Sequence, residues 1–472
     1  MIDIKNLTIT QAHGALIKKE FTAMDLAKAY LSEIENKNKD INAYIEVYDD
    51  VIDQAKVADT KITEGKATMM TGIPLAIKDN ILIAGKKVTS GSKILEGYVA
   101  TYDAGIVKKL KNEGAVFLGR TNMDEFAMGG STETSYYGPT KNPYDLTRVP
   151  GGSSGGSAAA LAMNGALATI GSDTGGSIRQ PASLCGLVGL KPTYGAVSRS
   201  GLMAMASSLD QIGPLAKNVE DAKILFEAIR GKDPLDSTSI DAMPIQAKEG
   251  NLVLGVPTAF IEKGLDPDVR KNFDQSVEKL KKAGHTIKEI ELPNIGYSLP
   301  VYYIIMPAEV SSNLARFDGI KYGFHSAGKN LLEDYTKSRG EGFGKEARRR
   351  IILGTYVLSA GYYDAYYNKA TAVRSMITSD FKKAFMSVDA ILTPTSPCPA
   401  FKIGEKTSDP LTMYLSDIFT VSVNLAGIPA ISVPSGFTNR EGKDLPLGLQ
   451  IMAPHWGENT LFKIGADFEK IR

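Results

Sequence analysis

The sequence predicts an α/β protein with one mixed, mostly parallel central sheet that helices cover on both faces. Short apolar runs suited to buried strands alternate with segments of helical periodicity along most of the chain, which is typical of parallel sheets. Glycines end several of the helical segments just before the next apolar run. Proline and glycine are spread along the chain and mark no long linker, which favours a single large domain over residues 1–472.

The first elements follow this pattern clearly. Thr22 can cap a helix through its hydroxyl, with Asp25 three residues later, and apolar residues then recur at helical spacing. The apolar run Ile73–Ile77 predicts a buried strand. A helix over Gly105–Asn112 ends near a glycine, and a second strand follows over Ala115–Gly119. The order of strand and helix predicts crossover connections between parallel strands.

The same rhythm returns in the second half of the chain. A strand at Leu252–Val256 precedes a helix over Asp268–Ala283 and a further strand near Ile287–Leu292. Residues 297–383 are rich in Tyr and Arg and predict a mostly helical layer over the sheet. Three more strands are predicted at Ala390–Pro394, Ala430–Pro434 and Leu447–Ala453.

Composition excludes several classes of protein. The 472 residues are 43% hydrophobic and 23% charged, which are ordinary values for a soluble globular protein. The formal net charge of +1 demands neither a nucleic-acid nor a membrane partner. The N-terminus lacks the pattern of a signal peptide, and the longest uncharged stretch, Val149–Ser172, is too rich in Gly, Ser and Ala to span a bilayer. We therefore expect a cytoplasmic protein without membrane contact.

Histidine and cysteine contribute little candidate chemistry. The four histidines are far apart in sequence and form no HExxH motif, so a helical two-histidine zinc site is not expected. Two cysteines, Cys185 and Cys398, are too few for a disulfide scaffold or a multi-cysteine metal site. We expect no metal on this chain and, if it is a hydrolase, a base other than histidine.

Two Ser/Gly-rich loops are the strongest candidates for a catalytic site. The first is GGSSGGS (Gly151–Ser157), and an Ala-rich helix is predicted between it and the second, SDTGGSIRQPAS (Ser172–Ser183). A Gly/Ser run alone is more often a linker, but a linker is not braced by a buried helix. Glycines allow close backbone approach to a ligand, and serines supply nucleophiles. The N–H groups predicted to hold the oxyanion of a tetrahedral intermediate are those of Thr174, Gly175, Gly176 and Ser177.

A serine nucleophile needs a base, and Lys78 is the candidate. It directly follows the predicted strand Ile73–Ile77. It could simply face solvent or pair with Asp79. A desolvated, neutral lysine is the alternative, since burial can lower a lysine pKa by several units. Serine–lysine pairs are known substitutes for the Ser–His–Asp triad.

The whole stretch from Gly151 to Ala182 resembles the signature sequence of the amidase signature family. Members of that family hydrolyse amides with a Ser–Ser–Lys triad. The resemblance implies that Lys78 is the base, that Ser153 is the bridging serine held after a cis peptide bond, and that Ser177 is the nucleophile. The chain would then carry one α/β amidase domain.

The resemblance also implies roles for the neighbours of this triad. Neutral Lys78 would take a proton from Ser153, which would take one from Ser177 during attack on the amide carbonyl. Ser154 would help to orient Lys78. Separately from the resemblance, we expect Asp173 and Arg179 to form a structural pair that braces the second loop, with a direct catalytic role as the alternative.

Five further segments resemble, in order, one branch of the family, the glutaminase subunits of tRNA-dependent amidotransferases. They are Thr121–Pro143, Lys191–Pro214, Ser311–Gly319, Glu341–Tyr367 and Asp409–Pro434. This likeness implies that the chain hydrolyses glutamine and supplies ammonia for converting Glu-tRNA(Gln), and possibly Asp-tRNA(Asn). A kinase/transamidase B subunit would bind the tRNA, ATP and Mg²⁺, and a small C subunit would complete the complex. No cofactor is expected on this chain.

Glutamine also needs partners for its two α-groups. The family pattern implies Arg350 for the carboxylate and Asp417 for the ammonium, with Tyr302 as a neighbour. Two alternatives remain at this stage. A stand-alone amidase acting on another small amide would have no use for the charge pair, and a non-catalytic subunit would be expected to lose part of the triad.

Overall fold

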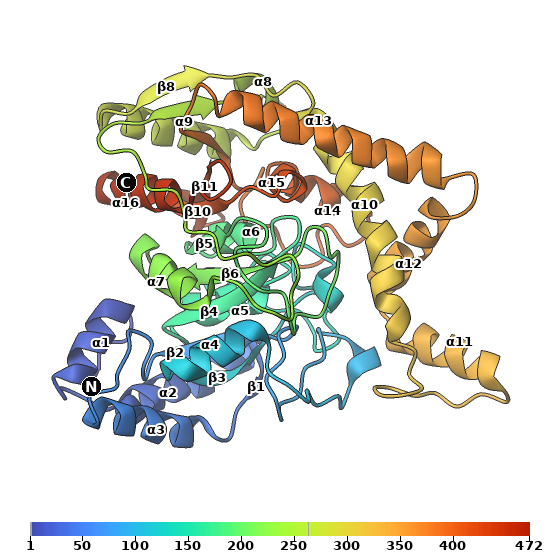
Figure 1. Cartoon of the computed structure of the whole chain (residues 1–472), viewed down its shortest axis with the longest axis horizontal. Coiled ribbons are helices and arrows are strands. Elements are labelled where there is room, and N and C mark those ends of the chain that lie inside the picture. The colour runs from blue at the N-terminus through green and yellow to red at the C-terminus, as the bar shows by residue number, and fades with distance from the viewer. Residues whose placement is uncertain (1, 263) are drawn as a thin grey trace.

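The central feature of the computed structural model is one sheet of eleven strands (Figure 1). The structure describes residues 2–262 and 264–472. The strand order is β1-β3-β2-β4-β6-β5-β10-β11-β9-β7-β8. The strands are β1 (Tyr44–Val47), β2 (Pro74–Lys78), β3 (Val116–Thr121), β4 (Ala168–Asp173), β5 (Val188–Lys191), β6 (Gln211–Ala216), β7 (Val253–Val256), β8 (Thr286–Glu289), β9 (Ala390–Pro394), β10 (Ala430–Arg440) and β11 (Lys443–Met452). Both halves of the chain therefore contribute to a single sheet, joined where β5 pairs with β10.

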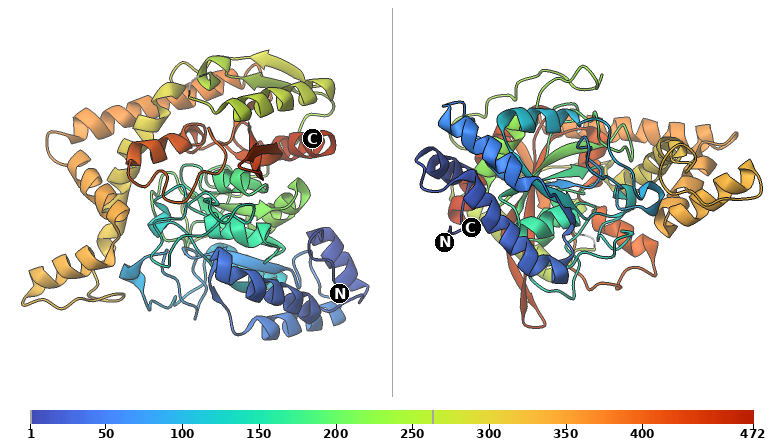
Figure 2. Two further views of the ribbon diagram at one scale, coloured as in Figure 1. Left: turned by 180° about the vertical axis from the view of Figure 1, so that it is seen from behind. Right: turned by 90° about the horizontal axis from the view of Figure 1, so that it is seen from below.

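Helices lie on both sides of this sheet (Figure 2). The α-helices are α1 (Ile9–Ile17), α2 (Ala23–Ile41), α3 (Val51–Thr63), α4 (Gly105–Glu113), α5 (Gly155–Ala162), α6 (Arg179–Leu184), α7 (Val219–Ile229), α8 (Thr258–Ile261), α9 (Pro267–Lys282), α10 (Ser298–Asn313), α11 (Leu331–Gly342), α12 (Lys345–Val357), α13 (Lys369–Ala384), α14 (Pro410–Tyr414), α15 (Val421–Ala426) and α16 (Glu458–Ile471). Shorter helical turns are η1 (Lys93–Leu95), η2 (Glu125–Ala127), η3 (Ile295–Tyr297), η4 (Leu314–Arg316), the π-helix η5 (Tyr363–Asn368) and η6 (Leu415–Asp417). None of the helices in the described part of the chain combines the length and apolar character that a membrane crossing needs.

The α/β class and the predicted elements are confirmed. Thr22 caps α2 in a reciprocal capping box with Asp25, as the spacing of the two residues predicts. The strand at Ala390–Pro394 has the predicted bounds. The other predicted strands overlap β2, β3, β7, β8, β10 and β11, and β10 continues beyond the predicted end at Pro434 to Arg440.

The predicted predominance of parallel pairing is wrong. Among the described residues, six of the ten pairs of neighbouring strands are antiparallel and four are parallel. The clearest case is β10 and β11, which form a hairpin through Glu441 and Gly442, both with positive φ (54° and 79°). A two-residue turn of this kind joins only antiparallel strands. The expected alternation of strand and helix does not hold for these two apolar runs, because no helix lies between them.

Four strands were not predicted, and one of them changes the interpretation of the catalytic segment. β4 occupies Ala168–Asp173, between the Ala-rich helix α5 and the second Ser/Gly loop. The two loops are therefore joined by a helix and a buried strand, whereas the sequence indicated a helix alone. β4 lies parallel to β2, with Ile77 opposite Ile170, and this brings the end of β2 beside Ser172.

The core forms a layer on each face of the sheet. Leu392 and Ile451 belong to the apolar cluster that includes α16, whereas their chain neighbours Ile391 and Met452 belong to the cluster that includes α10 and α13. Successive strand residues point to opposite faces, so the two clusters lie on opposite sides of the sheet. The segment 297–383 is mainly helical, and α11 projects from the end of α10 (Figure 1).

Candidate active site

Lys78 lies at the carboxyl end of β2, where parallel pairing with β4 brings three polar atoms around its amine. Its Nζ lies 2.7 Å from the Ser153 hydroxyl, 2.9 Å from the Ser172 hydroxyl and 3.3 Å from the Ser172 carbonyl oxygen. The side chain is fully buried. Of the two interpretations of Lys78 that the sequence allows, the structure favours the desolvated lysine, because Asp79 pairs with Arg120 instead.

The buried environment lowers the pKa of the Lys78 amine, so a large fraction of it is uncharged at neutral pH. Burial lowers its pKa to about 7, and the opposing charges of Asp124, Asp173 and Asp210 do not offset that effect. A neutral amine has two N–H donors and one lone pair. The Ser172 carbonyl oxygen can only accept, so it takes one N–H, while the close Ser153 hydroxyl can donate to the lone pair. Lys78 is thus placed to accept a proton from Ser153.

The two Ser/Gly loops bring Ser153 and Ser177 together. The Gly152–Ser153 peptide bond is cis, as the family resemblance implies. The backbone N–H of Ser154 donates to the carbonyl oxygen of Ser177 at 3.1 Å, which ties the loops to each other. The Ser177 hydroxyl makes no hydrogen bond with the described residues, and the residue is 7% exposed. Its oxygen therefore remains free to turn toward Ser153 and toward a ligand.

Ser154 lies next to the predicted triad without contacting the Lys78 amine. Its hydroxyl donates to the carbonyl oxygen of Ser172 at 3.1 Å and accepts from the Ser172 N–H at 3.3 Å. Ser154 therefore holds the backbone of Ser172, the residue that contacts the Lys78 amine. Ser172 itself was missed from the sequence, because its strand was not recognised. A prediction of β4 parallel to β2 would have placed Ser172 beside Lys78. The Asn80 side-chain amide donates to the Ser172 hydroxyl at 3.0 Å.

Three of the four predicted oxyanion donors remain available. The N–H of Gly176 is already bound to Asp173 Oδ1 at 2.8 Å, so in this geometry it is not free for an oxyanion. The N–H groups of Thr174, Gly175 and Ser177 have no hydrogen-bond acceptor among the described residues. A Cβ at Gly175 would lie 2.7 Å from the Tyr302 ring, so the loop can pass Tyr302 only with glycine there.

Asp173 and Arg179 brace the second loop from inside the protein. The guanidinium contacts both carboxylate oxygens, at 2.9 and 3.0 Å, and both side chains are fully buried. Burial alone would raise the pKa of Asp173, but the Arg179 charge dominates and holds that pKa well below its usual range. Arg179 also donates to Gln450 and Asn424, on β11 and α15. The pair thus anchors the loop to the C-terminal half of the sheet.

The three residues predicted to bind substrate line one region near the second loop. Arg350 is the buried member of its arginine run, whereas Arg348 and Arg349 are exposed. Asp417 ends η6 and accepts a hydrogen bond from the Tyr303 hydroxyl at 3.0 Å. Tyr302 lies against Gly175 of the second Ser/Gly loop. Burial raises the pKa of Asp417 to about 7, against the opposing effects of the Tyr303 hydrogen bond and the Arg350 charge.

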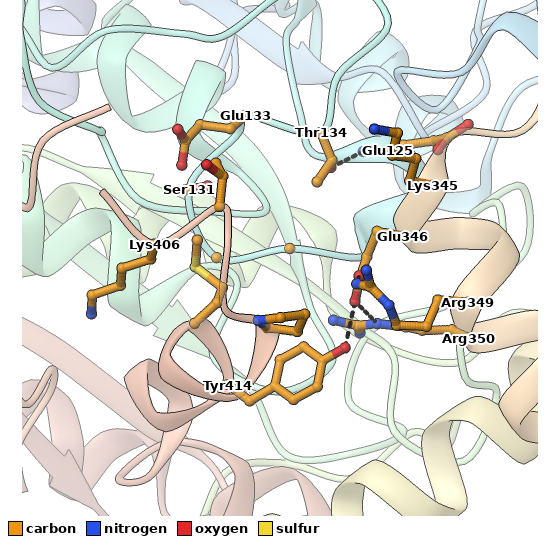
Figure 3. A pocket seen from close by; sticks show the side chains of 15 residues that line it. Glu125, Ser131, Glu133, Thr134, Lys345, Glu346, Arg349, Arg350, Lys406 and Tyr414 are labelled. Carbon is orange, nitrogen blue, oxygen red and sulfur yellow. Dashed lines mark hydrogen bonds and ion pairs between the residues drawn. The ribbon is translucent and has the colours of Figure 1, made fainter. Parts of the chain in front are cut away.

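Beside Arg350 opens a cavity of about 320 Å³ with charged walls (Figure 3). Its lining residues are Glu125, Gly129, Gly130, Ser131, Glu133, Thr134, Lys345, Glu346, Arg349, Arg350, Lys406, Thr407, Pro410, Met413 and Tyr414. Gln180 links the cavity wall to the first Ser/Gly loop, because it donates to the Gly130 carbonyl oxygen and accepts from the Gly152 N–H, each at 2.9 Å. Sequence reasoning missed Tyr303, Tyr414 and Glu346, which surround Arg350. The i, i+4 spacing of Glu346 and Arg350 was the one available signal.

The lowered pKa of Lys78 predicts a pH-dependent stability. Between about pH 7 and pH 10 an unfolded lysine still holds a proton that folded Lys78 has released, so the unfolded state binds more protons. The free energy of unfolding therefore rises with pH across this window. Below it, Lys78 is protonated in both states and adds nothing to the pH dependence of stability. We expect the free energy of unfolding of wild type, measured relative to Lys78→Met, to rise by on the order of a few kcal/mol from pH 7 to pH 10. Denaturant titration at several pH values measures this difference, and a flat difference would contradict a neutral buried lysine.

Comparison with known proteins places this site in context. A family model described as Amidase matches residues 25–462. The chain is 52% identical over 475 residues to the A subunit of the glutamyl-tRNA(Gln) amidotransferase of Desulfatibacillum aliphaticivorans, covering 99% of this chain and 97% of that protein. It is 53% identical to the corresponding A subunit of Carboxydothermus hydrogenoformans, over 96% of this chain and 94% of that protein.

Two solved structures show how widely this fold is used. The crystal structure of the glutamyl-tRNA(Gln) amidotransferase A subunit of Thermotoga maritima is 44% identical and covers 100% of this chain and 96% of that chain, with a TM-score of 0.82. The peptide amidase of Stenotrophomonas maltophilia is 28% identical and covers 99% and 97%, with a TM-score of 0.81. The buried lysine, the two serine loops and these likenesses lead to one conclusion. The chain belongs to the amidase family.

Proposed function

We propose that this chain is the glutamine-hydrolysing subunit of a tRNA-dependent amidotransferase and that it works through a Ser–Ser–Lys triad. The observation that carries the catalytic part is the fully buried Lys78 amine, with a pKa of about 7, 2.7 Å from the Ser153 hydroxyl. Such an amine is half neutral at pH 7, whereas an ordinary lysine is almost wholly protonated there. The relatives above, at 52% and 53% identity, support the choice of this amidase branch.

Acylation begins with a two-step proton relay. Lys78 Nζ accepts the Ser153 proton as Ser153 Oγ accepts the Ser177 proton, and Ser177 Oγ attacks the carboxamide carbon of glutamine. The carbonyl oxygen gains the negative charge and is held by the N–H groups of Thr174, Gly175 and Ser177. Each such donor typically contributes about 3–4 kcal/mol to lowering the barrier. The relay raises the nucleophilicity of a hydroxyl that is otherwise weak at neutral pH.

The same relay completes the cycle in reverse. Lys78 returns its proton through Ser153 to the departing nitrogen, so that neutral ammonia leaves as the C–N bond breaks and a glutamyl ester remains on Ser177. Water then attacks this ester with its proton taken by the relay, and glutamate leaves as Ser177 regains its proton. Each half of the cycle starts and ends with neutral Lys78.

Charge complementarity supports glutamine as the substrate. Its α-carboxylate suits the Arg350 guanidinium and its α-ammonium suits ionised Asp417, with Tyr302 beside the reacting loop. Because burial raises the pKa of Asp417 to about 7, this carboxylate gains its charge as pH rises through that value. Binding of the glutamine α-ammonium by Asp417 therefore strengthens in the same pH range in which Lys78 becomes neutral. A small amide without α-groups would gain nothing from either residue.

The organisation of the complex is proposed from the names of the relatives. Each of the two is named as the A subunit of a glutamyl-tRNA(Gln) amidotransferase. We infer that a B subunit uses ATP and Mg²⁺ to activate Glu-tRNA(Gln), or Asp-tRNA(Asn), that a small C subunit binds both, and that the complex is cytoplasmic. The net charge of +1 suits a chain that leaves tRNA binding mainly to its partner.

Loss of Arg350 or Asp417 is expected to weaken glutamine binding. Arg350→Ala and Asp417→Ala each leave a charged α-group unpaired, so we expect the KM for glutamine to rise roughly 30-fold or more. Steady-state ammonia release measures this. Arg348→Ala is the matched control, because that arginine is exposed on the same helix and should leave KM unchanged. Added ammonium should restore product formation by the assembled complex, and its failure to do so would assign the two residues another role.

The proposal as a whole is tested by ammonia release from glutamine, with and without co-expressed B and C subunits. We expect hydrolysis that increases, or becomes coupled to acceptor amidation, when the complex assembles on size-exclusion chromatography. A chain that stays monomeric beside both subunits and hydrolyses small uncharged amides in preference to glutamine would instead be a stand-alone amidase.

A further inference from the structure

Glu346 and Arg350 lie one turn apart on α12 and face each other at the cavity wall (Figure 3). Glu346 Oε1 accepts the Arg350 Nε–H at 2.7 Å. The same oxygen accepts the Tyr414 hydroxyl at 2.8 Å, and the other oxygen pairs with Arg349. Burial would raise the pKa of Glu346, but the Arg350 charge and these donors lower it overall. The carboxylate is thus ionised and has donors at both of its oxygens.

The remaining contacts of the Arg350 guanidinium are with two aromatic rings and a sulfur atom. The ring of Tyr303 lies 5.4 Å and that of Tyr414 5.3 Å from Arg350 Cζ, and the two rings stack 4.0 Å apart. Nη1 has only the Met306 sulfur at 3.5 Å, which is a weak acceptor. The Nη2 group has no acceptor among the described residues. The fork formed by Nη1 and Nη2 is therefore still available to a carboxylate, whereas the Nε edge is occupied.

We propose that Glu346 is a positioning residue for substrate selection: it holds the Nε edge of Arg350 so that the Nη1–Nη2 fork faces the α-carboxylate of the bound amide. This inference rests on the proposed function and names a residue that the triad and the predicted α-group partners do not include. A guanidinium binds a carboxylate through two parallel hydrogen bonds, so a rotation of its plane loses both. Tyr414 and Arg349 act in turn by holding the Glu346 carboxylate.

A Glu346 carboxylate that competed with the substrate for Arg350 would have the opposite effect on the KM for glutamine. A carboxylate beside Arg350 repels a second carboxylate and competes for the same cation. If competition dominated, removing Glu346 would lower the KM for glutamine. The geometry favours positioning, because Glu346 contacts Nε and leaves the fork open.

The experiment compares Glu346→Ala and Glu346→Gln in the complex, with Glu341→Ala, an exposed acidic residue on α11, as the control. Glutamine and butyramide, which lacks both α-groups, are the two substrates. We expect Glu346→Ala to raise the KM for glutamine about tenfold with kcat changed by less than about twofold. The amide oxygen of Glu346→Gln still accepts from Nε–H and Tyr414, so this variant should recover most of the loss. Hydrolysis of butyramide should be unchanged in all variants.

Each result decides one question. A lower KM for glutamine in Glu346→Ala, an unchanged KM, or an equal loss with butyramide would overturn the positioning role. Thermal unfolding of each variant separates a misfolded protein from a misplaced arginine. If the alanine variant does not fold, Tyr414→Phe removes one donor to Glu346 Oε1 and should raise the KM for glutamine, though by less, and leave butyramide hydrolysis unchanged. Failure of the wild-type complex to hydrolyse glutamine would overturn the proposed function itself and is distinct from any difference between variants.

Discussion

Ser177→Ala is expected to abolish glutamine hydrolysis, by a factor on the order of 10⁵ or more, while the protein stays folded. The Ser177 hydroxyl makes no hydrogen bond with the described residues, so its removal costs the fold little. In the proposed mechanism it is also the oxygen that forms the acyl bond, and neither Ser153 nor water takes its place. Ammonia release under single-turnover conditions measures the loss.

The control for this variant is Ser237→Ala, in an exposed loop, which should have wild-type activity. The thermal midpoint of Ser177→Ala should lie within a few degrees of the wild-type value. Residual hydrolysis above about 1% of wild type, in protein free of contaminating glutaminase, would show that another residue acts as the nucleophile.

Replacement of Lys78 is expected to have the next largest effect. Lys78→Ala removes the proposed base, and Lys78→Arg should not restore it, because a guanidinium stays protonated at any pH the protein survives. We expect acylation to fall roughly 10³-fold or more in both variants. Wild-type acylation should rise with pH through about 7, as Lys78 loses its proton. Rapid-quench measurement at saturating glutamine follows this step without the contribution of Asp417 to binding.

Lys191 provides a matched control for the pH profile. It is buried in β5 and burial also lowers its pKa to about 7, but its amine donates to the Pro192 carbonyl oxygen, away from the two serines. Lys191→Met should therefore keep the rise in acylation near pH 7. Loss of that rise in Lys191→Met, or wild-type activity in Lys78→Arg, would contradict the proton relay.

The sequence predicted most strands because a buried strand needs a continuous apolar run, and such runs are visible without any tertiary information. It did not predict the pairing of the strands, which depends on how the connections run. The strand β4, which contains Ser172, was not predicted for a related reason. β4 begins with Ala and ends with Gly, Ser and Asp, so its signal for a strand is weak, and its pairing with β2 and β6 is visible only in the tertiary structure.

The site was predictable where its residues lie in one continuous motif and less so elsewhere. Ser153 and Ser177 belong to a long signature, and Lys78 directly follows a predicted strand. The commitment of the Gly176 N–H to Asp173 depends on backbone direction, which no residue pattern encodes. Tyr303, Tyr414 and Glu346 matter because they surround Arg350 in space, and they come from three separate helices.

The central claim is that Ser177 carries the glutamyl group during turnover. The most direct test mixes the protein with excess glutamine, quenches with acid within the first turnover, and identifies the modified peptide by mass spectrometry. The relay predicts a glutamyl ester on Ser177 in the wild-type protein and no ester in Ser177→Ala. A glutamyl ester on any other residue, or one that persists in Ser177→Ala, would contradict it.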